Sequence, residues 1–563
     1  MSTLEEAITA VEVVDERRPA SGWWDWFDRA ATAINQRLNP ILVKESRQAL
    51  KSKQFSVTFT LVLAAAWGWT MLGVAIVGPS IFYGSSGLFL FGGYFLILAF
   101  ALLVVVPFSA FWSLGTERSD GTYELLSVTT LTPRHVITGK LSSSMLQMLV
   151  YYSALAPCLA FTYLLRGIDL PLIAMVLFYA FHASLGLSAI GLLVATATSE
   201  RHWQVVLSVF MVAGLLIVFF FAFLFGVSIA EFTGMAAVDE PLFWISNLAV
   251  LSVFWGYFAL VVQAASSQLD FPSNNRSTKL RYVMLFQQLL FLGWMTYGIY
   301  LSSERFFFVL LLTFSGVHWA VMGTFMVGET GELSLRVRRQ LPQSFLGRAF
   351  LTWFNPGSGA GYVFTLGSYL ALVIMTVIAE TIWREYPGSS YTQSLVSWMK
   401  DFNPLMFGLT MFLYLAIYLG LTRLIMLLLR RAGYGTMFMS LLVNILLILL
   451  GCGIPLSIHL MEPYWRSDYT MLEVSNPFWT LAEMSGANLP FQVQLMVLTL
   501  LAAPAGLIVL LNLPTIAREV QQVRAAKPRR VVEDDRAKQP VAAPERKNPW
   551  DDGPPVAIIP EDK

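Results

Sequence analysis

The chain has 563 residues, of which 56% are hydrophobic and only 13% are charged, and its formal net charge is +1. Soluble domains are about one quarter charged, so this composition predicts a membrane protein. The near-neutral balance argues against a nucleic-acid partner. Both cysteines, Cys158 and Cys452, lie in apolar runs, so we expect packing roles for them and no disulfide framework or metal cluster.

The N-terminal segment, residues 1–56, is expected to be cytosolic. Its first twenty residues are acidic and lack a basic stretch leading into an apolar one, so we expect no cleavable signal peptide. Further on, apolar residues recur at helical spacing: Trp23, Phe27, Ala30, Ile34 and Leu38. This spacing predicts a helix lying along the lipid headgroups. A Trp-rich tail packed on the cytosolic side is the alternative.

Apolar windows of about twenty residues predict an all-α, polytopic fold with about twelve membrane-spanning helices. They begin near Val57, Leu88, Leu141, Leu170, Val205, Leu242, Tyr282, Phe306, Tyr362, Leu405, Thr436 and Val493. Lysines and arginines concentrate on one alternating set of loops, which the positive-inside rule makes cytoplasmic together with both termini.

A charged stretch at residues 117–140, ERSDGTYELLSVTTLTPRHVITGK, separates the second and third spans and therefore lies at the membrane surface. Its residues 119–122 can cap the start of a short helix. Thr132 followed by Pro133 is typical of an N-cap and a first-turn proline. We expect a short helix, a turn, and the helix that becomes the third span.

This stretch resembles the segment after the second span in the membrane subunits, or permeases, of ABC-2 type ABC transporters, approximately E-R-E-x-G-T-x-E-L-L-x-x-T-P-L-x-x-x-x-I-x-x-G-K. The residues that fit are Glu117, Arg118, Gly121, Thr122, Glu124, Leu125, Leu126, Thr129, Leu131, Ile137, Gly139 and Lys140. Thr130 departs from it, since the family usually has proline there. Upstream, residues 39–45, NPILVKE, are similar to the N-P-[IV]-[LV]-x-K-E opening before the first span of many such permeases.

The resemblance implies that the chain is a permease of the bacterial cytoplasmic (inner) membrane, with an elbow helix near its N-terminus. It implies that residues 116–140 form a coupling helix in a groove of a separate ABC ATPase subunit. The implied coupling residues are Glu117, Arg118, Gly121, Thr122, Glu124, Leu125, Leu126, Gly139 and Lys140. The alternative is a non-transporting membrane scaffold or sensor, because any polytopic protein has charged, capped loops.

The sequence has no G-x-x-x-x-G-K-[ST] phosphate loop and no H-E-x-x-H motif, so we expect no catalytic, cofactor or metal site in this chain. The spans are almost wholly apolar, without a chain of carboxylates for proton relay. This favours export of a lipidic, amphipathic or polymeric substrate. We expect hydrogen-bonding roles between helices for five polar residues inside spans: His182, His318, Asn444, Gln147 and Gln263. Gly357-Ser358-Gly359 has no partner histidine for a nucleophile.

Two halves are expected by topology, residues 57–267 and 268–513, each with two spans, a long cytoplasmic stretch and four further spans. In the second stretch, residues 328–361, Thr330-Gly331-Glu332-Leu333 echoes Thr122-Tyr123-Glu124-Leu125. The chain is either a fused pseudo-dimer or a six-span permease with a divergent extension. Expected partners are the ATPase, membrane lipids, and a second copy or another permease subunit.

Two further segments carry predictions. The loop at residues 457–490 is polar and aromatic, and we expect it to be external and to form short helices at the outer leaflet, although an ordinary aromatic belt has the same composition. Residues 514–563 are rich in proline and charge, which predicts a disordered cytosolic tail from Arg518 onward.

Overall fold

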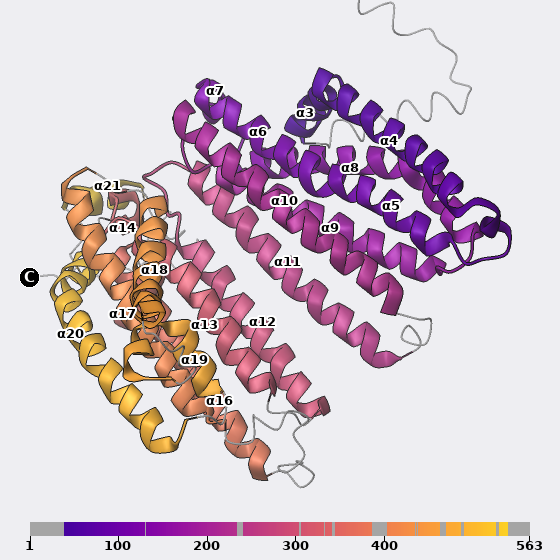
Figure 1. The fold of residues 1–563 in the computed structure, drawn as a ribbon. Helices are drawn as coiled ribbons and strands as arrows, with labels where there is room; N and C mark the ends of the chain where they lie inside the picture. The colour runs from indigo at the N-terminus through magenta and orange to yellow at the C-terminus, as the bar shows by residue number, and fades with distance from the viewer. Residues whose placement is uncertain are drawn as a thin grey trace, which may run out of the picture. The chain divides into compact units, whose positions relative to one another are not determined.

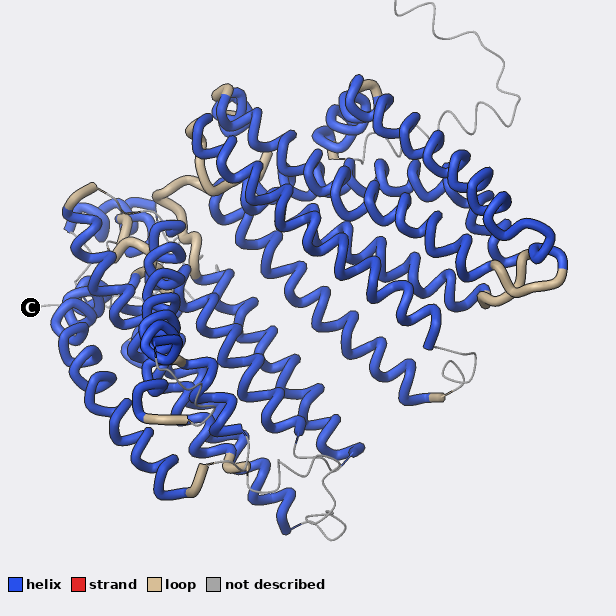
Figure 2. Tube along the Cα trace, viewed as in Figure 1, coloured by secondary structure: helices blue, strands red, loops and turns tan. Residues whose placement is uncertain are grey.

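The computed structural model describes residues 39–538, except 130, 233–239, 303–305, 332, 340–343, 386–401, 434, 436, 462–468, 486–488 and 525–528. The predicted interfacial helix from Trp23 to Leu38 and the matched residue Glu332 lie outside the described residues. Within the described chain, helices are the only regular secondary structure (Figure 2). The predicted all-α fold is therefore confirmed for this part.

Eleven helices of the described chain are long and apolar enough to cross a membrane, which confirms a polytopic membrane character. Each contains or adjoins one of the predicted span starts. The remaining predicted span coincides with helix α12 (Thr278–Ser302), which has 25 residues but carries Lys279, Arg281, Gln287 and Gln288. The total of twelve spans stays a prediction.

The chain divides into two compact units. Unit 1 comprises residues 1–272 and 276–311, and unit 2 comprises residues 273–275 and 312–563. The division expected from the sequence followed topology, whereas these units follow packing, so α12 belongs to unit 1. The repeat hypothesis remains open.

Unit 1 is a helical bundle (Figure 1). Its elements are α3 (Pro40–Leu50), α4 (Lys53–Val77), η1 (Gly78–Phe82), α5 (Gly87–Phe100), η2 (Ala101–Val105), α6 (Val106–Ser119), α7 (Thr122–Ser127), α8 (Pro133–Leu164), α9 (Leu170–Ala195), α10 (Arg201–Phe232), α11 (Pro241–Leu269), α12 and the start of α13 (Phe306–Val327). Its core is built mainly from α5, η2, α6, α8 and α9, whose facing side chains are buried.

A π-helical turn, η2, joins α5 to α6 and has a local cause. Pro107 has no backbone N–H, so the carbonyl of Leu103 four residues earlier cannot receive its usual helical hydrogen bond. The widened turn at Ala101–Val105 accommodates this defect. The hydroxyl of Ser184 on α9 donates to the carbonyl of Leu102, so the turn is also bonded to the neighbouring helix.

Unit 2 is centred on α17 (Pro404–Arg431), which packs against α16 (Ser358–Glu385), α18 (Met437–Met461) and α20 (Phe491–Arg524). Its other elements are the rest of α13, α14 (Leu335–Arg339), α15 (Phe345–Leu351), η4 (Thr352–Phe354), η6 (Met471–Ser475), α19 (Pro477–Ser485) and α21 (Arg529–Lys538).

The short helices predicted for the loop at 457–490 are present as η6 and α19. Thr470 and Glu473 form a reciprocal capping box at the start of η6. Two tyrosines of α17 hold the turn: Tyr414 donates to the carbonyl of Val474 at 2.5 Å, and Tyr418 donates to that of Ser475 at 2.8 Å. The described part of the loop that forms η6 and α19 is thus folded onto α17.

The intramembrane amides follow the prediction in part. Asn444 on α18 donates to Thr324 on α13 at 2.7 Å and accepts from Thr422 on α17 at 3.1 Å, so it joins three helices. Gln147 accepts from Ser109 of another helix at 3.1 Å. The prediction is wrong for Gln263, which bonds Ser267 one turn further along the same helix.

The prediction of a disordered tail from Arg518 is wrong for residues 518–524 and 529–538, which belong to α20 and α21. Glu519 explains the continuation of α20, because it forms an ion pair of 2.8 Å with the fully buried Arg423 and accepts from Ser358 and from the Gly359 N–H. Helix α21 carries opposite charges four residues apart, such as Arg530 and Asp534, and such spacing supports a surface helix.

Removing one partner of the Arg423–Glu519 ion pair should lower the stability of unit 2. Arg423→Met is expected to lower the free energy of unfolding by about 3 kcal/mol, because Glu519 then remains mostly buried without its cation. Arg423→Met with Glu519→Met should recover most of that loss, whereas the exposed Arg431→Met should change it by less than ~0.5 kcal/mol. Denaturant titration in micelles measures all three, and equal effects of Arg423→Met and Arg431→Met would contradict a structural role.

Candidate functional site

The two sequence stretches that resemble the transporter family meet where α3 packs on α8. Asn39 caps α3 by accepting from the Ile41 N–H at 3.1 Å, and its amide donates to the carbonyl of His135 at 2.7 Å. Gly139 permits this approach, since a Cβ there would lie 2.8 Å from the Cβ of Ile41. Residues about one hundred positions apart in sequence thus form one packed element.

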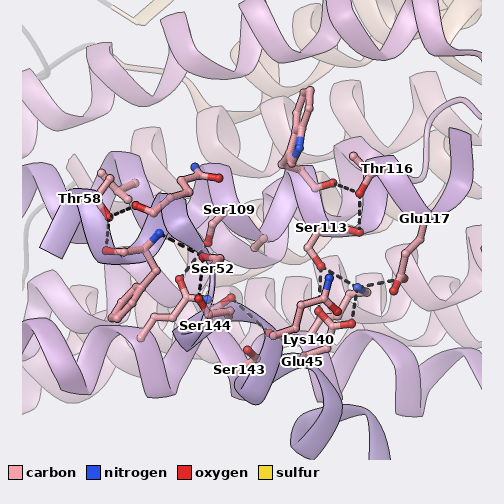
Figure 3. A pocket seen from close by; sticks show the side chains of 18 of the residues that line it. Glu45, Ser52, Thr58, Ser109, Ser113, Thr116, Glu117, Lys140, Ser143 and Ser144 are labelled. Atoms are coloured by element: carbon pink, nitrogen blue, oxygen red, sulfur yellow. Dashed lines mark hydrogen bonds and ion pairs between the residues drawn. The ribbon is translucent and has the colours of Figure 1, made fainter. Parts of the chain in front are cut away.

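Four charged side chains converge at this contact, and we call Lys44, Glu45, Glu117 and Lys140 the charge cluster. Figure 3 shows three of them, Glu45, Glu117 and Lys140. The Lys140 Nζ lies 3.1 Å from Glu45 and 3.0 Å from Glu117, and it donates to the hydroxyl of Ser113 at 2.7 Å. Ser113 in turn donates to Glu45 at 3.0 Å. Lys44 completes the cluster, 3.1 Å from Glu117.

Because the cluster is largely buried, each of its charges needs the others for compensation. The side chain of Lys140 is 2% exposed, that of Glu45 9% and that of Glu117 15%. The Lys140 ammonium donates to Ser113 and lies within ion-pair distance of the carboxylates of both Glu45 and Glu117. Two cations and two anions balance, so no buried charge is uncompensated. The cluster therefore joins α3, α6 and α8 only while all its members are present.

Lys44 is the exposed member, with 53% of its side chain accessible. Burial alone would lower the pKa of Lys44, but its hydrogen bond to Glu117 and the charges of Glu117 and Glu45 outweigh that effect, so the pKa is raised. The unfolded value is ~10.4, so the stability that Lys44 contributes is complete below that pH. It is lost only as the pH rises through the higher folded value, and Lys44 stays charged at physiological pH.

The short helix predicted after Asp120 is α7. Gly121 starts it with a φ of +71°, in the left-handed region that glycine adopts without strain. The hydroxyl of Thr122 donates back to the carbonyl of Glu117 at 3.0 Å. After α7, Thr132 caps α8 by accepting from the His135 N–H, and Pro133 is in its first turn, as predicted.

The end of α6 and the start of α7 are hydrogen-bonded to two other helices of unit 1, α9 and α11. The Arg118 guanidinium donates to the carbonyl of Thr196 at the end of α9. The Tyr123 hydroxyl donates to the carbonyl of Leu269 at the end of α11, at 3.1 Å. Burial raises the pKa of Tyr123, only partly offset by Arg118, so the hydroxyl keeps its proton for this bond. The position of α7 is thereby coupled to α9 and α11.

The predicted coupling residues divide into two groups. Glu117, Arg118, Gly139 and Lys140 lie inward, in the contacts above. Gly121, Thr122, Glu124 and Leu125 are exposed, and Leu126 belongs to α7. Among the described side chains of residues 117–140, the exposed large apolar ones are Leu125, at 74%, and Val128, at 87%.

Several functional candidates were missed from the sequence. Val128 and Tyr123 both stand at variable positions of the pattern, so the matched letters give no signal for either residue. Lys44 and Glu45 were noted within their motif but not as partners of Glu117 and Lys140. Their positions in two motifs with complementary charges were the available signal.

A polar cavity of about 290 Å³ adjoins the charge cluster inside unit 1 (Figure 3). Its wall includes hydroxyls at helical spacing on α6, namely Ser109, Ser113 and Thr116. The spans are thus not wholly apolar at this end of the bundle, and the apolar path across the membrane stays a prediction. Isolated serines and threonines are averaged away in apolar windows, so only their spacing could have revealed the cavity.

The lone intramembrane histidine of unit 1 has a packing environment. His182 lies among aromatic rings, with centroid distances of 4.2 Å to Phe178 and 5.4 Å to Phe254, and its Nδ1 is 2.9 Å from the Phe178 carbonyl. Groups of three or more metal-ligating side chains are not found within the described ranges.

Comparison of the chain with family models, curated proteins and solved structures found no match. The contacts of α3, α7 and α8 are therefore the basis on which a function is assigned.

Removing the central cation should separate these elements. Lys140→Met leaves Glu45 and Glu117 close together with only Lys44 for compensation, so we expect a loss of about 3 kcal/mol in the free energy of unfolding. Lys140→Met combined with Glu117→Gln should restore at least ~1 kcal/mol of it, because one uncompensated anion is removed.

Lys53→Met, at an exposed lysine of α4, is the matched control and should have almost no effect. Denaturant titration in micelles is applied to Lys140→Met, Glu117→Gln, their combination and Lys53→Met. Strict additivity of the Lys140 and Glu117 substitutions would show that the two side chains do not act together.

Proposed function

We propose that this chain is the membrane-spanning subunit of an ABC-2 type exporter and that a separate ABC ATPase binds at α7. The observation that carries the proposal is the charge cluster, because it brings both resembling motifs into one packed element beside α7. A docking helix needs exposed side chains that can contact the partner and other contacts that hold the helix in position. Leu125 and Val128 are exposed, while Arg118 and Tyr123 hold the helix in position.

The two groups of coupling residues would have different tasks. The exposed surface formed by Glu124, Leu125 and Val128 would contact the ATPase. Glu117 and Lys140 would then transmit a displacement of α7 to α3 and α8 rather than touch the partner. A ligand or partner can drive a conformational step only through contacts that differ between the two states. The inward network supplies such contacts.

The proposal assigns ATP hydrolysis to the partner, since this sequence has no phosphate loop of the G-x-x-x-x-G-K-[ST] type. It places α7, the basic loops and both termini on the cytoplasmic side of the bacterial inner membrane. The transported substrate would be lipidic, amphipathic or polymeric.

The docking surface can be tested on the native complex. Leu125→Asp with Val128→Asp is expected to reduce the ABC ATPase that copurifies with the chain about tenfold, because two carboxylates would be desolvated in the contact. Phe271→Asp, at another side chain 55% exposed, is the control and should leave the yield unchanged. The purified chain alone should not hydrolyse ATP.

Robust hydrolysis by the chain alone, or the lack of any copurifying ABC ATPase, would overturn the proposal and favour a scaffold or sensor. Leu346→Asp distinguishes the architectures, since Leu346 on α15 is 68% exposed in the second cytoplasmic stretch. If the chain is a fused pseudo-dimer, the Leu346→Asp protein should copurify with less ATPase. If the second half is a divergent extension, the amount of copurified ATPase should not change.

A further inference from the structure

The polar cavity beside the charge cluster is one of two adjacent hollows in the described part of unit 1. A groove of about 440 Å³ lies on α4, α5 and α10, and its wall is almost entirely apolar, including Leu61, Ala65 and Ile97. Thr58 and Val105 line both the cavity and the groove, so the two lie side by side. In Figure 3, Thr58 lies at the end of the cavity away from Lys140, Glu45 and Glu117.

The positions of the lining residues along α4 follow the change from the polar cavity to the apolar groove. Thr58 is five residues from the first residue of α4, or roughly 8 Å at the helical rise, which is near the membrane interface for a helix that spans the bilayer. Ala65 is seven residues further, roughly 10 Å deeper. The cavity is therefore at headgroup depth and the groove is at acyl-chain depth.

The chemistry of the cavity selects one kind of headgroup. Two carboxylates and one ammonium group line it, and the ammonium group of Lys140 is already ion-paired with both Glu45 and Glu117. Lys44, which balances the cluster, is not part of the lining, so an anionic group in the cavity would face two carboxylates and a single cation that is already paired. A neutral or cationic group with N–H or O–H donors suits the carboxylates.

The uncharged wall adds hydrogen-bonding capacity. Ser109 donates to the Val106 carbonyl and to Gln147, which leaves its oxygen lone pairs as acceptors. Within the described chain the side-chain N–H₂ of Gln147 has no hydrogen-bond acceptor, and Ser143, which is 4% exposed, makes no hydrogen bond through its hydroxyl. The wall can thus both accept from and donate to a ligand hydroxyl.

We propose that unit 1 binds a single-chain amphiphile whose neutral or cationic, hydroxyl-rich headgroup occupies the polar cavity and whose chain lies in the apolar groove. The cavity volume of about 290 Å³ is at the lower end of small-ligand sites and fits a compact headgroup. Lipid tails are as apolar as the groove, so the headgroup contacts supply the selectivity.

This inference needs the membrane placement of unit 1 and not the ATPase partnership, so it is tested without an ATPase. The full chain is placed in phosphatidylcholine nanodiscs with a monoacylglycerol that carries a diazirine in its acyl chain. We expect photolabelling concentrated on peptides of α4 and α5. Unlabelled monoacylglycerol and sphingosine should compete, and lysophosphatidic acid should not.

Two variants locate the site. Ala65→Trp should fill the groove and reduce labelling at least about fivefold, whereas Ala64→Trp, at an equally exposed neighbour outside the groove, should not. Gln147→Leu should reduce it at least about threefold through loss of the headgroup contact. Because Ala65 is exposed, its substitution tests the site even if Gln147→Leu does not fold.

Equal labelling of the Ala65→Trp and Ala64→Trp proteins, or labelling spread evenly over all lipid-facing helices, would overturn the site. Competition by lysophosphatidic acid as strong as that by monoacylglycerol would overturn the assigned headgroup chemistry.

Discussion

The neutralisation of one buried ammonium group, that of Lys140, is the constraint on which the functional end of unit 1 depends. A lysine at this depth is stable only with its charge balanced and its donors satisfied. Glu45 supplies one anion from α3 and Glu117 the other from α6, and Ser113 accepts a hydrogen bond from the ammonium group. The same ion pairs therefore fix the first helix, the third span and the base of α7.

The sequence predicts the parts of this site better than their arrangement. Apolar windows locate the spans, and Thr132 with Pro133 marks the start of α8 because capping is local. The pairing of Lys140 with Glu45 is a long-range contact that no local pattern specifies. The same reason explains the wrong prediction for the tail, since the partner of Glu519 is Arg423 on α17.

The polar cavity of unit 1 connects the proposed ATPase docking at α7 with the proposed binding of an amphiphile. The stripe of hydroxyls on α6 forms a cavity that ends at the charge cluster, so a ligand there would touch Glu45, Glu117 and Lys140, the residues that support α7. Occupancy of the cavity and the position of α7 would then be linked through shared side chains, and such coupling is reciprocal. A cluster that is uncharged or loosely packed could not provide this link.

Hydrogen–deuterium exchange of the Glu117→Gln protein tests the central claim most directly, because Glu117 contacts Lys44 of α3 and Lys140 of α8, and its carbonyl accepts from Thr122 of α7. The account predicts faster exchange in residues 40–50 and 122–127 together. Asp120→Asn, at the neighbouring exposed carboxylate, should leave both segments unchanged. Faster exchange in only one of the two segments, or in neither, would contradict a cluster that holds α3 and α7 jointly.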